Sequence, residues 1–385
     1  MKDDSSHRAP LKRLQGTLPE GIPLPTVSRP LLAYGAETGN TFTLTDGVKA
    51  YISPDIGDLR DPSTCDIYLH SISEMKASLG VDPEIAVHDL HPDYISTRYA
   101  ARSGANKLVA VQHHHAHAAA CMHENGLSEH VLAVTYDGMG LGDDGTIWGG
   151  EFLICNLAHY ERKAHLKAYP LPGGDQGTLY PERMAFSCLV SEPQLGQEAA
   201  GHLLAGLSDQ ETEFISRILE KHIHSPLTSS AGRLFDAVAA MLGFQGKISS
   251  PAEAAIGLQK AATPGVAGVY SYAIEDWQLG FGSMFAEILS DKQAHVDNGA
   301  IAAKFHNTLA AGTVDMCDKI REDTGLDKVA LSGGVFHNTL LAGLIMKGLQ
   351  DKTFNVFEHS LLPPGDVCVS FGQAIIASVK ETSCA

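Results

Sequence analysis

The chain has 385 residues and a formal net charge of -17, with 44% hydrophobic and 19% charged residues. This balance excludes a disordered protein, and the length favours two lobes over one ordinary core. The acidic charge argues against unaided binding to nucleic acid, because phosphates require a basic surface. A protein or a small molecule is the expected partner.

Seven cysteines are scattered along the chain, and none forms a CxxC pair. Such an odd, dispersed set predicts reduced thiols in the cytoplasm and not a disulfide framework or a zinc ribbon. No apolar run approaches the roughly 18 residues of a membrane span. The N-terminus has no hydrophobic stretch of the signal-peptide type. We therefore expect a cytoplasmic protein without membrane contact.

The predicted elements begin after a proline-rich stretch, residues 1–30, which is expected to be an extended linker or tail. Residues 31–52 alternate strand patterns with glycine-containing turns and predict a β-meander. A helix at 63–79 follows, then the strand EIAVHDL, a helix starting near Asp93 and the strand KLVAV. These elements form the predicted N-terminal lobe, residues 31–130.

The second lobe, residues 131–385, repeats this order of elements. VLAVTYDG, TIWGGEFLICNL and ERKAHLKAY predict another meander, and a helical insertion follows at about 180–260. Next come a helix in KFHNTLAAGTVDMCDKIREDTG, a strand in VALSGGVF, a helix in NTLLAGLIMKGLQ and a strand in FNVFEHS. The repeated order predicts duplicated α/β lobes facing a cleft.

A histidine-rich run, QHHHAH, lies where the strand KLVAV leads into an alanine-rich helix. His113 and His117 are four residues apart and share one helix face, so both imidazoles could bind one metal ion such as zinc or iron. A bare HxxxH pair is common without a metal, so this spacing needs support from other ligands. His114 and His115 point away from that face and are expected to pack or to support the ligands.

Two carboxylates stand where they could complete this site. Asp137 follows the apolar strand VLAVTY, and Asp366 ends the PPGD motif just before a segment of small residues. Carboxylate oxygen complements imidazole nitrogen, so we expect these as the third and fourth ligands. Mixed nitrogen and oxygen ligation suits zinc, iron, magnesium or manganese, which leaves the identity of the metal open.

Glycine-containing turns follow apolar strands at Gly138 to Gly145, at Gly173-Gly174 and at Ser332-Gly333-Gly334. Their backbone amides could hold phosphate oxygens, although each turn could equally serve only to supply positive φ angles. Asp236 could hydrogen-bond a ribose or be a solvated helix charge, and Asn338 could contact a nucleotide or cap the helix that it opens. The candidate nucleotide-binding residues are Gly138, Gly145, Thr146, Gly232, Asp236, Gly333, Gly334 and Asn338.

Several motifs occur in a fixed order and are far more specific together than singly. They are LLAYGAETGNTFTL, IGDLRD, HDLHPDY, QHHHAHAAACMHENG, DGMGLGDDGTIWGGEF, LPGGD, SSAGRLFDAVAAMLG, SGGVFHN and PPGD. In this order they resemble the C-terminal, Kae1-like region of the hydrogenase maturation carbamoyltransferase HypF, from residue 31 to about 377.

The resemblance implies a two-lobed ASKHA fold, the architecture of sugar kinases and of the Hsp70 ATPase. It also implies transfer of a carbamoyl group from carbamoyl-adenylate, made from carbamoyl phosphate and ATP, to the C-terminal cysteine of the protein HypE. HypE then converts this group into the cyanide ligands of [NiFe] hydrogenase. The positions that match the family's metal ligands are His113, His117, Asp137 and Asp366; Asp236 matches its ribose-binding aspartate, and Gly333, Gly334 and Asn338 match its nucleotide-binding turn.

The chain also departs from the family pattern. Val367-Cys368 stands where the family usually has glycines, and Gly39 replaces a usual lysine. The chain is expected to lack the family's acylphosphatase, zinc-finger and YrdC-like domains, either as a naturally short form or as an excised domain. Two other functions remain open: threonylcarbamoyl transfer to tRNA, as in Kae1, and a non-catalytic role as a metal- and nucleotide-binding partner in hydrogenase assembly.

Overall fold

The computed structural model describes residues 20–193, 195, 206–250 and 252–383, and the chain divides into two compact units. Unit 1 holds the residues up to Glu129, Asn156–His159 and the residues from His359 onward. Unit 2 holds His130–Cys155 and Tyr160–Glu358. This division differs from the predicted lobes 31–130 and 131–385, because the last segment belongs to unit 1.

Unit 1 is built on a sheet with the strand order β1-β4-β3-β2-β5-β6. As predicted, β2, β3 and β4 form an antiparallel meander, and β5 and β6 extend the sheet in parallel from β2. Of the predicted tail, residues 1–19 lie outside the described residues, and β1 pairs with β4. The strands are β1 (Ile22–Pro23), β2 (Leu31–Ala33), β3 (Thr43–Thr45), β4 (Lys49–Ile52), β5 (Ile85–Asp89) and β6 (Lys107–Val111).

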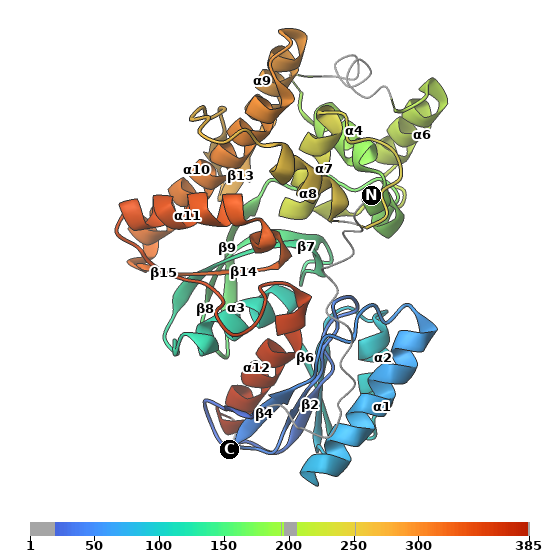
Figure 1. Ribbon diagram of the computed structural model, residues 1–385, viewed down its shortest axis with the longest axis vertical. Helices are drawn as coiled ribbons and strands as arrows, with labels where there is room; N and C mark the ends of the chain where they lie inside the picture. The colour runs from blue at the N-terminus through green and yellow to red at the C-terminus, as the bar shows by residue number, and fades with distance from the viewer. Residues whose placement is uncertain (1–19, 194, 196–205, 251, 384–385) are drawn as a thin grey trace, which may run out of the picture. The chain divides into compact units, whose positions relative to one another are not determined.

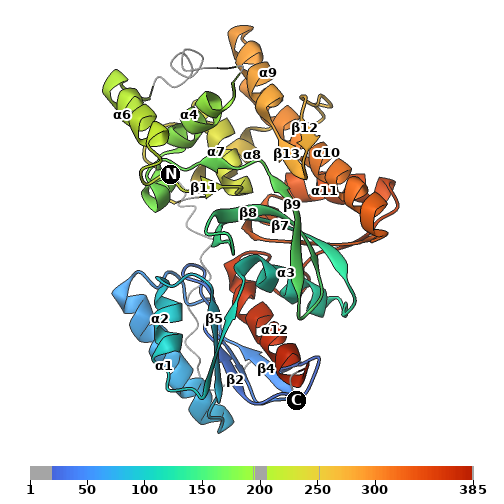
Figure 2. The same ribbon diagram turned by 180° about the vertical axis from the view of Figure 1, so that it is seen from behind.

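In unit 1, α1 and α2 cover one face of the sheet and α12 covers the other (Figures 1 and 2). α1 begins at the side-chain cap of Asp61 and ends at Gly80, whose left-handed backbone suits glycine. Tyr68 of α1 is fully buried and packs edge-on against Phe42. The helices of this unit are α1 (Pro62–Leu79), α2 (Ile95–Ala101), α3 (His113–Glu124), the short 3-10 helix η3 (Asp366–Cys368) and α12 (Val369–Ser383).

The histidine helix α3 packs directly against α12. A Cβ atom built at Gly372 of α12 would lie 1.9 Å from the carbonyl oxygen of Ala116 in α3, so only glycine permits this approach. All residues of α3 from His113 to Met122 are buried, and four of them are alanines. The close helix pair brings the start of α3 to η3, and this is why the C-terminal segment belongs to unit 1.

Unit 2 repeats the strand pattern of unit 1 within the order β12-β13-β9-β8-β7-β14-β15. β7, β8 and β9 form an antiparallel meander, and β14 and β15 extend it in parallel from β7, as β5 and β6 do from β2. The strands are β7 (Val131–Leu141), β8 (Ile147–Cys155), β9 (Tyr160–Leu166), β10 (Tyr169–Pro170), β11 (Leu227–Thr228), β12 (Ala273–Glu275), β13 (Gln278–Gly280), β14 (Lys328–Ser332) and β15 (Asn355–Phe357). This shared topology confirms the predicted α/β duplication of the ASKHA fold.

Helices α7, α10 and α11 share a core with the sheet of unit 2, and Tyr136 of β7 and Phe305 of α10 are fully buried in it. In Figures 1 and 2 the long α10 and α11 lie close to the strands, and α9 lies farther from them. The predicted helical insertion at 180–260 contains α4, α6, α7 and α8 among the described residues. The helices are η1 (Gly174–Leu179), α4 (Pro181–Ser191), α6 (Asp209–Glu220), α7 (Ala231–Met241), α8 (Glu253–Ala261), α9 (Gly282–Gln293), α10 (Asn298–Thr324), η2 (Gly334–His337) and α11 (Thr339–Asp351).

Within the described ranges, no helix combines the length and the hydropathy needed to cross a bilayer. None of the six cysteines in the described part is joined in a disulfide: Cys65, Cys121, Cys155, Cys188, Cys317 and Cys368.

Candidate metal and nucleotide sites

The first two turns of α3 present His113 and His117 on one side of the helix. α3 starts directly after β6, and the side chain of Gln112 caps it by accepting a hydrogen bond from the backbone N–H of His115. Because the two histidines are one turn apart, their rings meet edge to face with centroids 4.9 Å apart. Both side chains are buried, so each imidazole has a fixed position.

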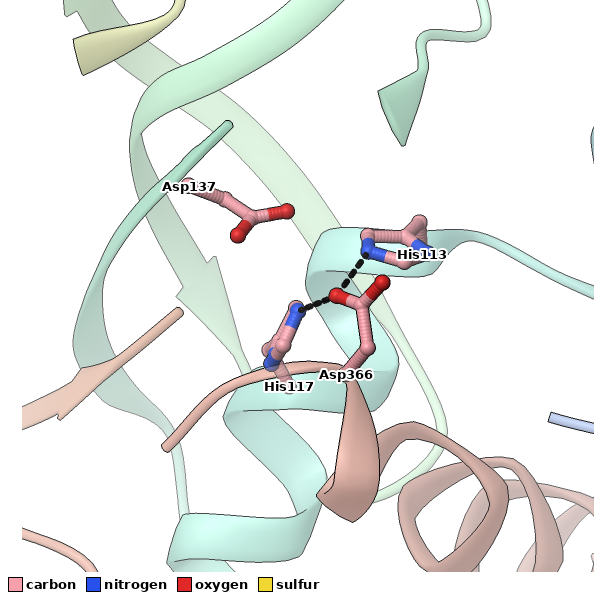
Figure 3. Close-up of side chains that lie close together, drawn as sticks. All are labelled: His113, His117, Asp137 and Asp366. Atoms are coloured by element: carbon pink, nitrogen blue, oxygen red, sulfur yellow. Dashed lines mark ion pairs between the residues drawn. The ribbon is translucent and has the colours of Figure 1, made fainter. Parts of the chain in front are cut away.

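Asp366 of η3 lies against both histidines (Figure 3). Its Oδ1 is 3.6 Å from the Nε2 of His113 and 3.7 Å from the Nε2 of His117. Donor atoms about 2.1 Å from a tetrahedral zinc ion would stand roughly 3.4 Å apart. The spacing of these three atoms therefore suits ligands around one cation better than direct hydrogen bonds, which are shorter. Metal binding by these residues stays a prediction.

The Nδ1 atom of His113, which is the ring nitrogen not facing Asp366, is held by a buried carboxylate. Nδ1 of His113 lies 2.7 Å from Oδ2 of Asp89, the last residue of β5. Oδ1 of Asp89 accepts the backbone N–H of His91, which fixes the carboxylate in turn. A carboxylate at Nδ1 favours the tautomer with its proton there, and this leaves the lone pair of Nε2 directed toward Asp366.

The other two histidines of the run have different hydrogen-bond partners, although the ring of His114 packs edge to face against that of His113, with centroids 5.3 Å apart. Nε2 of His115 lies 2.8 Å from the backbone oxygen of Asn156. Burial lowers the pKa of His115 to about 4, although that hydrogen bond opposes the change. Nδ1 of His114 lies 3.2 Å from the side-chain nitrogen of Gln112. Both rings therefore pack inside unit 1.

The loop that carries Asp366 is fixed to other parts of unit 1. Oδ2 of Asp366 accepts a hydrogen bond from the hydroxyl of Thr38, and the side chain is 23% exposed. Gly39 has a left-handed φ of +51°, and a Cβ atom there would meet Asp366 and Val367. Gly39 is therefore part of a turn that lies beside the candidate ligand.

In unit 2, Asp137 lies on β7 next to the SGG turn. Its Oδ1 accepts a hydrogen bond from the backbone N–H of Gly334. A Cβ atom at Gly333, where φ is +103°, would come within 2.3 Å of the backbone oxygen of Tyr136. The two glycines therefore let the turn approach β7, and one amide that could hold a phosphate instead positions a carboxylate.

The start of α7 packs against the same end of β7. The hydroxyl of Ser230 caps α7 and donates to the backbone oxygens of Asp137 and Gly138. A Cβ atom at Gly232 would lie 3.0 Å from the Cα of Gly138. Four of the candidate glycines thus gather around this point in unit 2: Gly138, Gly232, Gly333 and Gly334.

Asp236 lies one turn further along α7 and is not a solvated helix charge. It is buried, and its Oδ2 lies 3.0 Å from the guanidinium of Arg233. Its Oδ1 is buried and has no hydrogen-bond partner among the described residues. Burial raises the pKa of Asp236 to about 7, although Arg233 lowers it. A buried carboxylate oxygen without a hydrogen-bond partner suits a hydroxyl donor, such as that of a ribose.

We expect Asp236 to make the stability of the protein depend on pH. Because its folded pKa lies above the ordinary value of 3.8, its contribution to the free energy of unfolding is complete below pH 3.8 and is lost as the pH rises toward about 7. Relative to Asp236→Asn, the wild type should lose at most about 1.4 kcal/mol per pH unit across this window. Urea unfolding of both proteins at several pH values measures the difference, and parallel changes in the two would contradict this prediction.

Three other candidate residues have structural roles. Asn338 caps α11 by accepting the N–H of Leu341, and its amide nitrogen lies 2.9 Å from the Nε2 of His306. Gly145, with φ of +76°, and Thr146, which donates to Asp144, belong to the turn between β7 and β8. Nucleotide contacts by these residues stay predictions.

The sequence interpretation missed Asp89 and the groups around His117. Asp89 could have been found, because it ends β5 beside Val111 of β6 in a parallel pair. The residues that follow two neighbouring parallel strands meet at one edge of the sheet, and His113 follows β6. The partners at the Nδ1 side of His117, Cys368 and beyond it His359, come from the far end of the chain. The sequence interpretation noted Cys368 only as a departure from the family pattern.

Two family models match this chain. "Carbamoyltransferase, Kae1-like Domain, second subdomain" matches residues 133–373, and "HypF Kae1-like domain" matches residues 26–124. Among curated proteins, carbamoyltransferase HypF2 of Cupriavidus necator is 34% identical over 396 residues, which cover 95% of this chain and 49% of that protein. The carbamoyltransferase HypF homolog of the same organism is 35% identical over 380 residues, which cover 95% of this chain and 95% of that protein.

Solved HypF structures have the same fold. The crystal structure of full-length HypF in the phosphate- and nucleotide-bound form aligns with a TM-score of 0.89 and 35% identity over 94% of this chain and 57% of that one. HypF of T. kodakarensis aligns with a TM-score of 0.86 and 28% identity over 95% of this chain and 49% of that one. The chain therefore spans about half the length of HypF2 and of these structures. With one family model matching most of its length, this chain belongs to the HypF carbamoyltransferase family and comprises its Kae1-like region.

Proposed function

We propose that this chain transfers the carbamoyl group of carbamoyl-adenylate to the C-terminal cysteine thiol of HypE, in the synthesis of the cyanide ligands of [NiFe] hydrogenase. The observation that carries the proposal is the pair of imidazoles directed at one carboxylate, in a chain of the HypF family. The free thiols of the described part suit a reaction in the cytoplasm.

The donor set fits a divalent metal. His113, His117 and Asp366 would hold it, and Asp137 of unit 2 would supply a fourth ligand. Two imidazoles with carboxylates suit zinc or iron, and magnesium or manganese is a further candidate. When bound, the metal would act as a Lewis acid for phosphate or carbamoyl oxygen. The protein's own contribution is to fix both imidazoles, through Asp89 in the case of His113.

The nucleotide would bind in unit 2. We assign the ribose to Asp236, whose buried Oδ1 suits a hydroxyl donor, and the phosphate to the glycines at the end of β7. The similarity to full-length HypF in its phosphate- and nucleotide-bound form supports a nucleotide site in this chain. Held there, the adenylate would keep its carbamoyl carbon in one place for the incoming thiol, and such positioning lowers the barrier of a two-molecule reaction.

The reaction forms one bond and breaks one. The sulfur of the acceptor cysteine bonds to the carbamoyl carbon, the bond from that carbon to the phosphate oxygen breaks, and AMP leaves with the electron pair. The proton of the acceptor thiol passes to water or to the released phosphate of AMP. Carbamoyl-adenylate is already an activated anhydride, so a protein nucleophile is not required. Burial raises the pKa of Cys155 to about 12 and also raises the pKa of Cys188 and Cys317, so these three thiols are poor nucleophiles.

Mass spectrometry of HypE tests the proposal. HypE is incubated with this chain and pre-formed carbamoyl-adenylate, and in a second arm with ATP and carbamoyl phosphate. We expect one carbamoyl group on the terminal cysteine in the first arm, and the second arm shows whether this chain also makes the adenylate. An acceptor lacking that cysteine is the control. No transfer from supplied adenylate would refute the proposal, and salt-sensitive binding of tRNA with such a failure would favour threonylcarbamoyl transfer.

A further inference from the structure

The Nδ1 of His117 faces a cysteine sulfur, whereas the Nδ1 of His113 faces a carboxylate. Its Nδ1 lies 3.3 Å from the sulfur of Cys368, and both side chains are fully buried. Cys368 ends η3, two residues after Asp366. The same three-residue helix therefore places a carboxylate at the Nε2 of His117 and a sulfur at its Nδ1.

The two histidines share one arrangement. In each, Nδ1 faces a buried group, Asp89 for His113 and Cys368 for His117, and Nε2 faces Asp366. Groups that hold the outer nitrogen of a metal-binding imidazole fix its tautomer and its orientation. Asp89 is placed to hold His113 in this way through a carboxylate. Cys368 is placed to hold His117 through a sulfur, which is a weaker hydrogen-bond acceptor than a carboxylate.

Cys368 is itself supported from the opposite end of α3. The carboxylate of Glu124, in the last turn of α3, is 2.9 Å from the Nδ1 of His359 and accepts the backbone N–H groups of Ser360 and Leu361. Both side chains of this pair are buried. Glu124 therefore holds the chain segment that leads into the loop of Asp366.

His359 connects this pair to the sulfur. Burial lowers the pKa of His359, but its hydrogen bonds with Cys368 and Glu124 outweigh burial and raise the pKa to about 9. An imidazolium carries a proton on both nitrogens, so it can donate to the carboxylate and to the sulfur together. The sulfur then remains free to accept a hydrogen bond from His117. If the Nε2 of His117 is unprotonated, its Nδ1 carries the proton and needs such an acceptor.

We propose that Cys368 is a positioning residue that accepts a hydrogen bond from the Nδ1 of His117 and so directs the Nε2 of that ring at the metal. The proposal rests on the metal site of the proposed function. Glu124 and His359 hold the sulfur in place.

Zinc affinity, measured by competition with a chromophoric chelator, tests this role without an activity assay. Cys368→Ala should weaken Zn²⁺ binding about tenfold to a hundredfold, the range for loss of a group that orients a metal ligand. Cys368→Ser should recover part of the loss, because a hydroxyl also accepts a hydrogen bond. Cys65→Ala is the matched control, since the Cys65 thiol of the same unit bonds the backbone oxygen of Leu59, and it should bind Zn²⁺ as the wild type does.

Three outcomes would overturn the proposal. Cys368→Ala could bind Zn²⁺ as tightly as the wild type. Alternatively, the Co²⁺-loaded wild type could show an intense sulfur-to-cobalt charge-transfer band that Cys368→Ala removes, which would make Cys368 a ligand. If the wild type itself bound no Zn²⁺, the metal site would fail and this role with it. Circular dichroism of the metal-free variants checks their folding, and Glu124→Gln, which leaves the sulfur in place, should weaken Zn²⁺ binding in the same direction.

Discussion

Replacing His113 by alanine is expected to abolish stable metal binding. The wild type should hold about one divalent ion per chain, whereas His113→Ala should retain almost none after dialysis against a weak chelator. The substitution removes a nitrogen ligand and also leaves Asp89 buried without its partner. The loss of affinity should exceed the tenfold to hundredfold that is usual for an outer partner. Elemental analysis of the dialysed proteins measures the metal content.

His123→Ala is the matched control for this experiment. His123 lies in the last turn of the same helix, and its Nε2 contacts the backbone oxygen of Pro23. Its loss should leave the metal content unchanged. Full metal content in His113→Ala, or equal losses in both variants, would contradict the assignment of His113 as a ligand.

Replacing Gly372 by alanine should give the largest loss of stability. The new Cβ would lie 1.9 Å from the backbone oxygen of Ala116, so α12 and α3 would have to separate. Overpacking of a buried contact typically costs about 1–3 kcal/mol and occasionally more, and we expect a cost of at least about 3 kcal/mol here because the obstructing atom belongs to a helix backbone. Zn²⁺ affinity should fall as well, because these helices set the distance between the histidines and Asp366.

Gly343→Ala provides the comparison in urea unfolding. Gly343 lies inside α11 with no atom within 4 Å of its added Cβ, so alanine should raise the free energy of unfolding by about 0.5–1 kcal/mol. If Gly372→Ala unfolded at the same urea concentration as the wild type, the close packing of α3 on α12 would be wrong.

The order of elements could be predicted because each repeat combines local signals that agree. Alternating strands with glycine turns gave both meanders, and the cap at Asp61 and the stop at Gly80 mark a helix in the sequence itself. The placement of α12 could not be predicted in this way. It depends on a contact between Gly372 and Ala116, which are far apart in the sequence, and no local pattern reports such a contact.

In the candidate site, too, local sequence patterns predicted some residues, and contacts between distant parts of the chain supplied the others. The spacing of His113 and His117 follows from helix geometry, and the sequence therefore indicated both. The structure adds what surrounds them: a carboxylate from β5 and a sulfur from η3. Asn338 shows the reverse case, because a polar residue at the start of a helix has a capping role that motif position alone does not separate from ligand binding.

Anomalous diffraction from crystals of the Zn²⁺-loaded chain tests the central claim most directly. Data collected on either side of the zinc absorption edge distinguish zinc from any other bound ion. We predict one strong peak about 2.0–2.2 Å from the Nε2 atoms of His113 and His117 and from a carboxylate oxygen of Asp366, with Asp137 as the fourth ligand. A peak elsewhere, or none at these side chains in a fully loaded crystal, would contradict the metal site and the chemistry built on it.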